Sequence, residues 1–272
     1  CVLVEFLVQK YLLGGAPTLG NLSAVVTGLL LAFNLPANIP WWIIVIGAVV
    51  AIGVAKMTFG GLGHNPFNPA LVGRVFLLIA YPVQMTSFPE IKPLVGGIVD
   101  TFSGATPLAA VKSGAMAVAD ADLMNMFGGF TAGSMGELSA LALLLGGLYM
   151  IWRRVITWHI PVSVLGSMAV FAFVVALAQG GGAELYALPA FHLLAGGALL
   201  GAIFMATDYV TSPMTHKGMI IYGIGIGAIT MIIRLWGAYP EGMSFAILLM
   251  NSVTPLIDKY VKPKRFGITS KK

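Results

Sequence analysis

Residues 158–178 read WHIPVSVLGSMAVFAFVVALA, a run without an aspartate, glutamate, lysine or arginine. A helix needs about 20 mostly apolar residues to cross a bilayer, so this run predicts a membrane-spanning helix. The whole chain has the same character, because 58% of its 272 residues are hydrophobic and 9% are charged. Soluble domains average about 25% charged residues. The composition therefore excludes a soluble globular or disordered protein and predicts one all-α, polytopic membrane domain over residues 1–272.

Charged residues and Gly/Pro clusters divide the chain into about nine apolar segments. Several are shorter than a straight crossing requires, which predicts short or interrupted helices shielded by protein or by a cavity. The chain begins inside an apolar segment, so we expect further N-terminal sequence, with room for one more helix, before residue 1. The predicted spans are 1–13 (partial), 20–35, 41–58, 69–82, 137–152, 158–178, 189–206, 218–236 and 241–257.

A polar insertion, residues 83–136, separates two groups of spans. If this insertion faces outward, alternating spans place eleven basic residues on the opposite side, against only Lys92 and Lys112 in loops on its own side. Six of the eleven belong to the tail, residues 258–272. Basic loops remain on the cytoplasmic side of a membrane. The charges therefore predict a cytoplasmic C-terminus and an outward-facing insertion.

Residues 22–82 and 191–257 share a plan of three apolar helices with Gly/Pro-rich connections. In both, the second helix ends in an aromatic residue followed by glycine, Phe59-Gly60 and Trp236-Gly237. An odd number of spans separates corresponding elements, so the second copy is predicted to be inverted. Inverted repeats with interrupted helices place binding sites near their interface. The alternative is that apolar helices simply look alike.

Four longer motifs give the chain a family resemblance. It resembles the D subunits of Rnf complexes and, as a close relative, the B subunit of the sodium-translocating NADH:quinone oxidoreductase. The resemblance implies ten helices in two inverted five-helix repeats. The first would end near residue 82 and the second would cover 137–257. The motifs are GGLGHNPFNPALVGRVFLLIAYPVQMT (60–86), SGATPLA (103–109), ATDYVTSPMT (206–215) and YPEGMSFAILLMN (239–251).

Ser103, Gly104, Ala105 and Thr106 resemble the flavinylation motif of this family, in which FMN is attached to the threonine through a phosphoester. A transferase that moves FMN from FAD needs a hydroxyl on an accessible loop, and the small Gly104 and Ala105 let it approach the backbone. Pro107 would hold the turn open. The resemblance thus implies covalent FMN on Thr106; an ordinary Gly/Ser turn is the alternative.

Lys112 follows this motif, and its role can be interpreted in two ways. Its ammonium is a candidate counter-charge for the FMN phosphate. The alternative, which the sequence favours, is a solvated loop lysine.

Asn65 and Asn68 lie in a turn that the charge pattern places on the cytoplasmic side. Amide side chains both donate and accept hydrogen bonds, which suits the polar edge of a flavin ring. The resemblance implies a second, non-covalent riboflavin toward this side, with these two residues as contacts. The alternative is that they cap the helix that begins near Pro69.

Charges inside apolar segments are costly and need a partner or an aqueous cavity. Arg74 is one such charge, whereas Asp208 is better explained as an interfacial loop residue. Glycines 223, 225 and 227 indicate close helix packing. A single cysteine, Cys1, excludes an iron–sulfur cluster held within this chain alone. We predict no metal site and no catalytic residue here.

The resemblance implies a flavoprotein subunit that passes electrons between FMN and a second flavin. The complex would couple ferredoxin and NAD chemistry to Na⁺ or H⁺ transport across a bacterial or archaeal cell membrane. Its partners would be the A, B, C, E and flavinylated G subunits, a flavin transferase and membrane lipid, without nucleic acid. The alternatives are a quinone-reducing relative, a solute transporter similar to urea transporters, and a structural scaffold.

Overall fold

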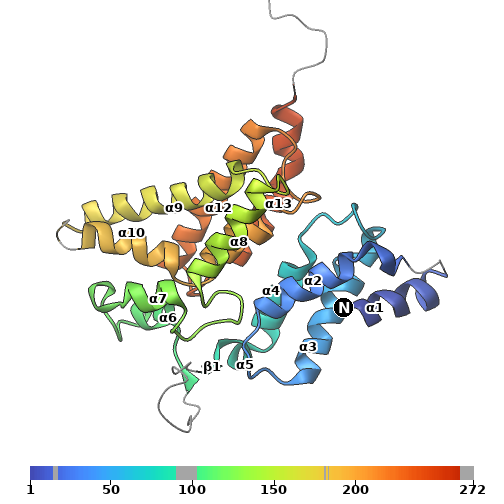
Figure 1. Ribbon diagram of the computed structural model, residues 1–272, viewed down its shortest axis with the longest axis horizontal. Coiled ribbons are helices and arrows are strands. Elements are labelled where there is room, and N and C mark those ends of the chain that lie inside the picture. The colour runs from blue at the N-terminus through green and yellow to red at the C-terminus, as the bar shows by residue number, and fades with distance from the viewer. Residues whose placement is uncertain (15–17, 90–102, 181, 183, 264–272) are drawn as a thin grey trace, which may run out of the picture.

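The computed structural model describes all residues except 15–17, 90–102, 181, 183 and 264–272. The outer end of the basic tail and Lys92 therefore lie outside the described residues. Helices make up nearly all of the regular structure, beside one two-stranded antiparallel pair (Figure 1). The elements are α1 (Val2–Leu7), α2 (Ser23–Phe33), α3 (Trp41–Ala48), α4 (Pro69–Ala80), α5 (Pro82–Thr86), β1 (Phe88–Pro89), β2 (Ser103–Gly104), α6 (Pro107–Lys112), α7 (Leu123–Gly128), α8 (Ala140–Trp152), α9 (His159–Ala178), α10 (Glu184–Leu194), α11 (Ala198–Leu200), α12 (His216–Trp236) and α13 (Met243–Tyr260).

Several helices are extended or joined by other helical turns. Wide π-type turns continue two helices of the first half, η1 (Val8–Leu12) after α1 and η3 (Val49–Val54) after α3. A third, η6 (Gly201–Met205), continues α11. Short 3₁₀ turns complete the set: η2 (Leu19–Asn21), η4 (Met57–Phe59) and η5 (Val118–Asp120).

Among the described residues, three helical segments are long and apolar enough to cross a membrane: Trp41–Phe59, His159–Ala178 and His216–Trp236. A fourth candidate consists of Leu185–Leu194 and Ala198–Met205, which are bent by 63° at the break between them. The predicted span at 189–206 is therefore an interrupted helix. These segments support a polytopic membrane protein. The count of nine spans and the inverted relation of the two halves remain predictions.

The two longest helices, α9 and α12, lie side by side, with α10 against α9 (Figure 1). Glycine allows this approach. A Cβ added at Gly223 would lie 1.8 Å from Ser163 Oγ, and one at Gly227 would lie 1.9 Å from Ser167 Oγ. Small residues let membrane helices pack closely where no hydrophobic effect drives them together. The predicted role of these two glycines in helix packing is confirmed.

One buried apolar cluster joins the two halves of the chain. It includes Leu31 of α2 and Leu77 of α4 from the first half, and Tyr222 of α12 and Ile247 of α13 from the second. Outward faces are also apolar, as Leu145 of α8 is 59% exposed. Such faces suit lipid rather than water.

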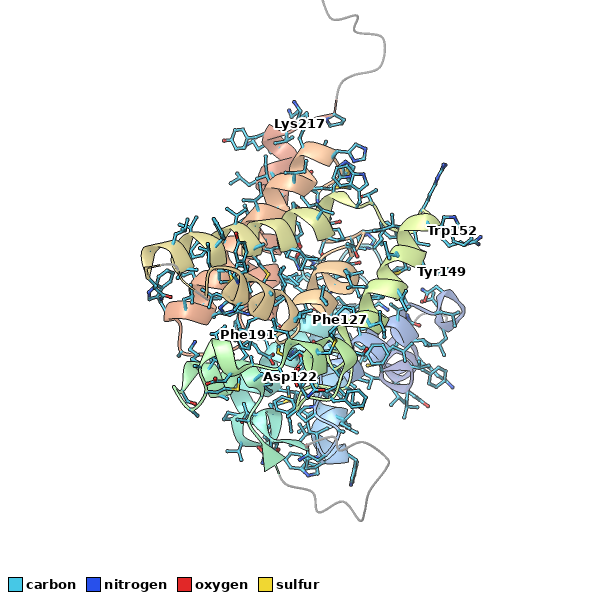
Figure 2. The ribbon with its side chains drawn as sticks, turned by 60° about the vertical axis from the view of Figure 1, so that its left-hand side comes forward. Asp122, Phe127, Tyr149, Trp152, Phe191 and Lys217 are labelled. Carbon is cyan, nitrogen blue, oxygen red and sulfur yellow. The ribbon has the colours of Figure 1, made fainter. Side chains whose placement is uncertain are left out.

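The insertion is partly helical and packs on the second half of the chain. Leu108 of α6 and Met126 of α7 share a buried cluster with Phe191 of α10. In Figure 2, Lys217, at the start of α12, lies near the top of the view, and Asp122 of the insertion lies below the middle. The predicted orientation in the membrane stays a prediction.

Candidate functional site

The flavinylation motif runs from a strand into a helix. Its first residues form β2, which pairs antiparallel with β1 so that Phe88 faces Gly104. Thr106 is the N-cap of α6, because its Oγ1 accepts a hydrogen bond from the Ala109 amide at 3.2 Å. Pro107 occupies the first turn of the helix, where its missing amide hydrogen costs nothing. The proline thus begins a helix rather than holding a turn open.

The side chain of Thr106 is 5% exposed, whereas the preceding Ala105 is exposed. The expectation of a readily accessible acceptor hydroxyl is therefore wrong for this conformation. The physical reason is the cap: Oγ1 turns back onto the amide of Ala109 and the side chain lies against cavity walls instead of bulk water.

A cavity of about 280 Å³, here named the Thr106 cavity, lies beside this hydroxyl. Its walls come from both halves of the chain and from the insertion. Most of them are apolar, with a polar group at one end. The lining consists of Asn34, Arg74, Leu78, Met85, Thr86, Phe88, Ala105, Thr106, Ala109, Tyr239, Pro240 and Glu241.

Arg74 of α4 organises the polar end of the Thr106 cavity. Its guanidinium forms a salt bridge with Glu241, from the turn before α13. Its Nη1 donates to Asn34 Oδ1 at 2.8 Å and to Ser244 Oγ at 2.9 Å. The prediction that Arg74 needs a partner or a cavity is confirmed on both counts.

Two further charges lie behind this pair. Glu137 is 8% exposed, and its Oε1 accepts a hydrogen bond from the Ser134 amide at 2.9 Å. Arg234 of α12 donates to the backbone carbonyls of His192 and Ala195, at the break between α10 and α11. We name Arg74, Glu137, Arg234 and Glu241 the charge cluster.

The break between α10 and α11 lies inside the charge cluster. A Cβ at Gly196 would lie 3.1 Å from an Arg234 nitrogen. A Cβ at Gly197 would lie 3.5 Å from Glu137 Oε2 and 3.6 Å from Arg74 Nη1. Backbone without helical hydrogen bonds is tolerated at membrane depth only where protein groups satisfy it. Here Arg234 supplies them.

Lys112 docks the insertion onto α12. Its Nζ donates to the Tyr239 carbonyl at 2.6 Å and to the Ile233 carbonyl at 3.1 Å. Partial burial lowers the pKa of this lysine. The interpretation as a freely solvated loop lysine is therefore wrong. The amine binds the Ile233 carbonyl in the last turn of α12, where a cation is favoured, and the Tyr239 carbonyl in the turn that follows.

A second cavity, of about 370 Å³, is here named the Asn68 cavity. Both asparagines of the predicted riboflavin site line it. Asn68 caps α4, since its Oδ1 accepts from the amides of Ala70 and Leu71. Its Nδ2 donates to the Met205 carbonyl at 3.2 Å. Asn65 bonds the Phe67 carbonyl at 3.0 Å. The capping alternative is thus confirmed for Asn68, and both residues also line the cavity.

Lys56 and Asp208 also line the Asn68 cavity. Lys56 Nζ contacts Glu5 Oε2 at 2.6 Å and donates to Ser23 Oγ at 2.6 Å. Burial raises the pKa of Asp208, and a hydrogen bond from Thr211 opposes this. Lys56, which is one member of a buried ion pair, and Asp208 thus give the cavity polar walls beside its apolar ones.

Residues 1–267 match a single protein family, described as NQR2, RnfD, RnfE. The chain belongs to this family. It is 50% identical to the D subunit of the Na⁺-translocating ferredoxin:NAD⁺ oxidoreductase complex of Acetobacterium woodii, over 98% of this chain and 80% of that protein. It is 44% identical to the D subunit of the proton-translocating ferredoxin:NAD⁺ oxidoreductase complex of Clostridium ljungdahlii, over 98% of this chain and 80% of that protein. The D subunit of an ion-translocating oxidoreductase complex from Stutzerimonas stutzeri is 42% identical, over 90% of this chain and 75% of that protein.

Sequence reasoning missed three members of the charge cluster as site residues: Glu137, Arg234 and Glu241. Glu137 and Glu241 each stand at the first position of a predicted apolar span, next to a loop of the outward side. The structure folds both loops inward. The available signal was the Gly196-Gly197 pair at the centre of an apolar segment, where a broken helix leaves carbonyls that charged side chains can bind.

Proposed function

We propose that this chain is the D-type membrane subunit of an ion-translocating ferredoxin:NAD oxidoreductase complex, and that it carries FMN on Thr106. The observation that carries the proposal is the position of Thr106. The threonine of the SGAT motif lines a mostly apolar cavity of about 280 Å³, which is close to the lower end of the range for small-molecule pockets, about 300 Å³. The names of the relatives from Acetobacterium woodii and Clostridium ljungdahlii support the assignment to such a complex.

The residues around the Thr106 cavity fit a flavin. An isoalloxazine ring has an apolar end and a heteroatom-rich end. Met85, Phe88 and Tyr239 offer apolar walls for the first. Asn34 and Arg74 offer an amide and a guanidinium for the second. FMN, when bound, supplies reversible electron storage, and the protein supplies its position and electrostatic surroundings.

The threonine is compatible with both its cap and an ester. Esterification replaces the hydroxyl hydrogen, but Oγ1 accepts rather than donates in its bond with the Ala109 amide. The N-cap therefore does not require the hydrogen that flavinylation removes. The same threonine can begin α6 and carry the phosphoester.

The Asn68 cavity supports a second, non-covalent flavin. Asn65 and Asn68 bring amide groups to its wall, and Asp208, Lys56 and Ser23 add charged and hydroxyl groups. We infer that electrons pass between this cavity and the Thr106 cavity. The basic tail and the start of α12 at Lys217 would then face the cytoplasm, with the A, B, C, E and G subunits as partners. The relatives' names record both Na⁺ and proton transport, so the coupling ion is not assigned.

Flavin fluorescence of the gel-resolved protein tests the proposal. The complex is produced together with a flavin transferase and denatured in SDS, which removes non-covalent flavin. We expect a fluorescent band for the wild type and for Thr106→Ser, and a dark band for Thr106→Ala. Thr86→Ala is the matched control, because Thr86 lines the same cavity outside the motif. It should remain fluorescent. A dark wild type would overturn the proposal.

A further inference from the structure

The charge cluster contains one acid with an unused atom. Oε2 of Glu137 has no hydrogen-bond partner among the described residues. Water does not readily replace one, because Glu137 is only 8% exposed. Buried carboxylate oxygens in native proteins are nearly always bonded or paired. Glu241 differs, since it forms a salt bridge with Arg74. Glu137 is therefore the acid of the cluster whose charge is least compensated.

Glu137 is surrounded by charges of both signs. Arg74 approaches from α4 and Arg234 from α12, while Glu241 approaches from the turn before α13. Burial and the nearby Glu241 disfavour the ionised form of the Glu137 carboxyl, whereas Arg74 favours it. With both arginines charged and both acids ionised, the cluster has no net charge. A further negative charge beside the cluster then favours the protonated form of a carboxyl.

Glu137 also lies next to the proposed flavin anchor. A small cavity of about 10 Å³ is lined by Thr106, Glu137 and Gly196, among others. Its volume is at the lower limit for about one water molecule. The Thr106 cavity adjoins the same threonine and contains the two partners Arg74 and Glu241. The carboxyl and any electron held at Thr106 therefore share one region of low dielectric.

We propose that Glu137 binds a proton when an electron enters the Thr106 cavity and releases it when the electron leaves. This inference rests on the proposed function. One electron comes from a reduced redox protein of the complex, and one proton comes from water through the small cavity to Oε2. The added negative charge next to a buried carboxylate disfavours its ionised form. Binding of the proton restores the charge balance of the region, and oxidation reverses both transfers.

Redox difference infrared spectroscopy of the flavinylated complex tests this step, because a protonated carboxyl has a C=O band that shifts in D₂O. Reduction with dithionite should produce this band in the wild type. Glu137→Gln should lose it, and Glu137→Asp, which retains a carboxyl, should show it at a shifted position. Asp122→Asn is the control, since it removes an exposed carboxylate of the same insertion, and should leave the band unchanged.

The outcomes separate the two proposals. A fluorescent SDS band together with no carboxyl band in the wild type, or with the band retained in Glu137→Gln, would overturn the role of Glu137 and leave the flavin in place. Loss of SDS fluorescence from the wild type would overturn the flavin and, with it, this inference. If Glu137→Gln fails to assemble, the shifted band of Glu137→Asp decides.

Discussion

Arg234 donates from its Nη2 to the backbone carbonyl of Ala195 at 2.8 Å, across the break between α10 and α11. A second nitrogen donates to the carbonyl of His192. These are carbonyls that the interrupted helix leaves without an amide partner. One side chain of α12 thus holds the bend of 63° that places Gly196 and Gly197 in the charge cluster.

Replacing Arg234 should destabilise the fold. Arg234→Met removes two charge-assisted hydrogen bonds and leaves buried carbonyls unsatisfied, at a cost of about 2–4 kcal/mol. Thermal unfolding in mild detergent measures the change. Arg153→Gln, an exposed arginine after α8, should leave the unfolding temperature unchanged. Equal stability of Arg234→Met and wild type would show that the break does not depend on this side chain.

Enlarging Gly223 should separate α9 from α12. A Cβ at this position meets Ser163 Oγ at 1.8 Å and the Ile160 carbonyl at 3.2 Å, so Gly223→Val overpacks the interface. The expected cost is about 1–3 kcal/mol or more. Gly166→Ala in α9 is the matched control, because nothing lies within 4 Å of its added Cβ. The same unfolding assay compares them, and an unaffected Gly223→Val would contradict the close packing.

Lys112 should control access to Thr106. The buried hydroxyl requires α6 to move before a transferase reaches it, and the two hydrogen bonds of Lys112 hold α6 against the end of α12. Lys112→Met should therefore speed flavinylation of the purified, folded apo complex. The rate is followed by SDS-resistant fluorescence after the addition of transferase and FAD. A slower rate would instead indicate that Lys112 helps to bind FMN, as its reading as a counter-charge predicts.

Asn68 should stabilise the N-terminus of α4 and also contribute to flavin binding in the Asn68 cavity. Asn68→Ala loses the cap at a cost of about 1 kcal/mol. Asn68→Asp keeps the acceptor oxygen but loses the donor to the Met205 carbonyl. We expect both variants to lose non-covalent flavin, and only the alanine variant to lose the cap contribution. Flavin released by mild denaturation is quantified beside the covalent band. Full retention of non-covalent flavin in both variants would remove Asn68 from that site.

The long apolar helices could be predicted closely from sequence. The predicted spans 158–178 and 41–58 match segments His159–Ala178 and Trp41–Phe59, because their boundaries are charges, prolines and glycines next to unbroken apolar runs. The prediction was less accurate at 69–82, because α4 ends at Ala80 and Pro82 starts a separate helix, α5. The segment predicted at 137–152 forms α8 only from Ala140, with Ser139 as its cap.

The site was predictable only in part. Thr106 and Asn68 belong to local motifs, and both proved to be helix caps beside cavities. The partner of Arg74 was not predictable, because Glu241 is 167 residues away in the chain. Burial of Glu137 also depends on how its loop returns into the bundle. No local pattern records either contact, since both arise from the tertiary packing of the two halves.

Mass spectrometry of the peptide that contains Thr106 tests the central claim most directly. The peptide is taken from a complex that matured with its flavin transferase and oxidises ferredoxin. We predict one FMN, joined through phosphate to Thr106, and an unmodified peptide from Thr106→Ala. An unmodified Thr106 in the active complex, or FMN on another residue, would contradict the account.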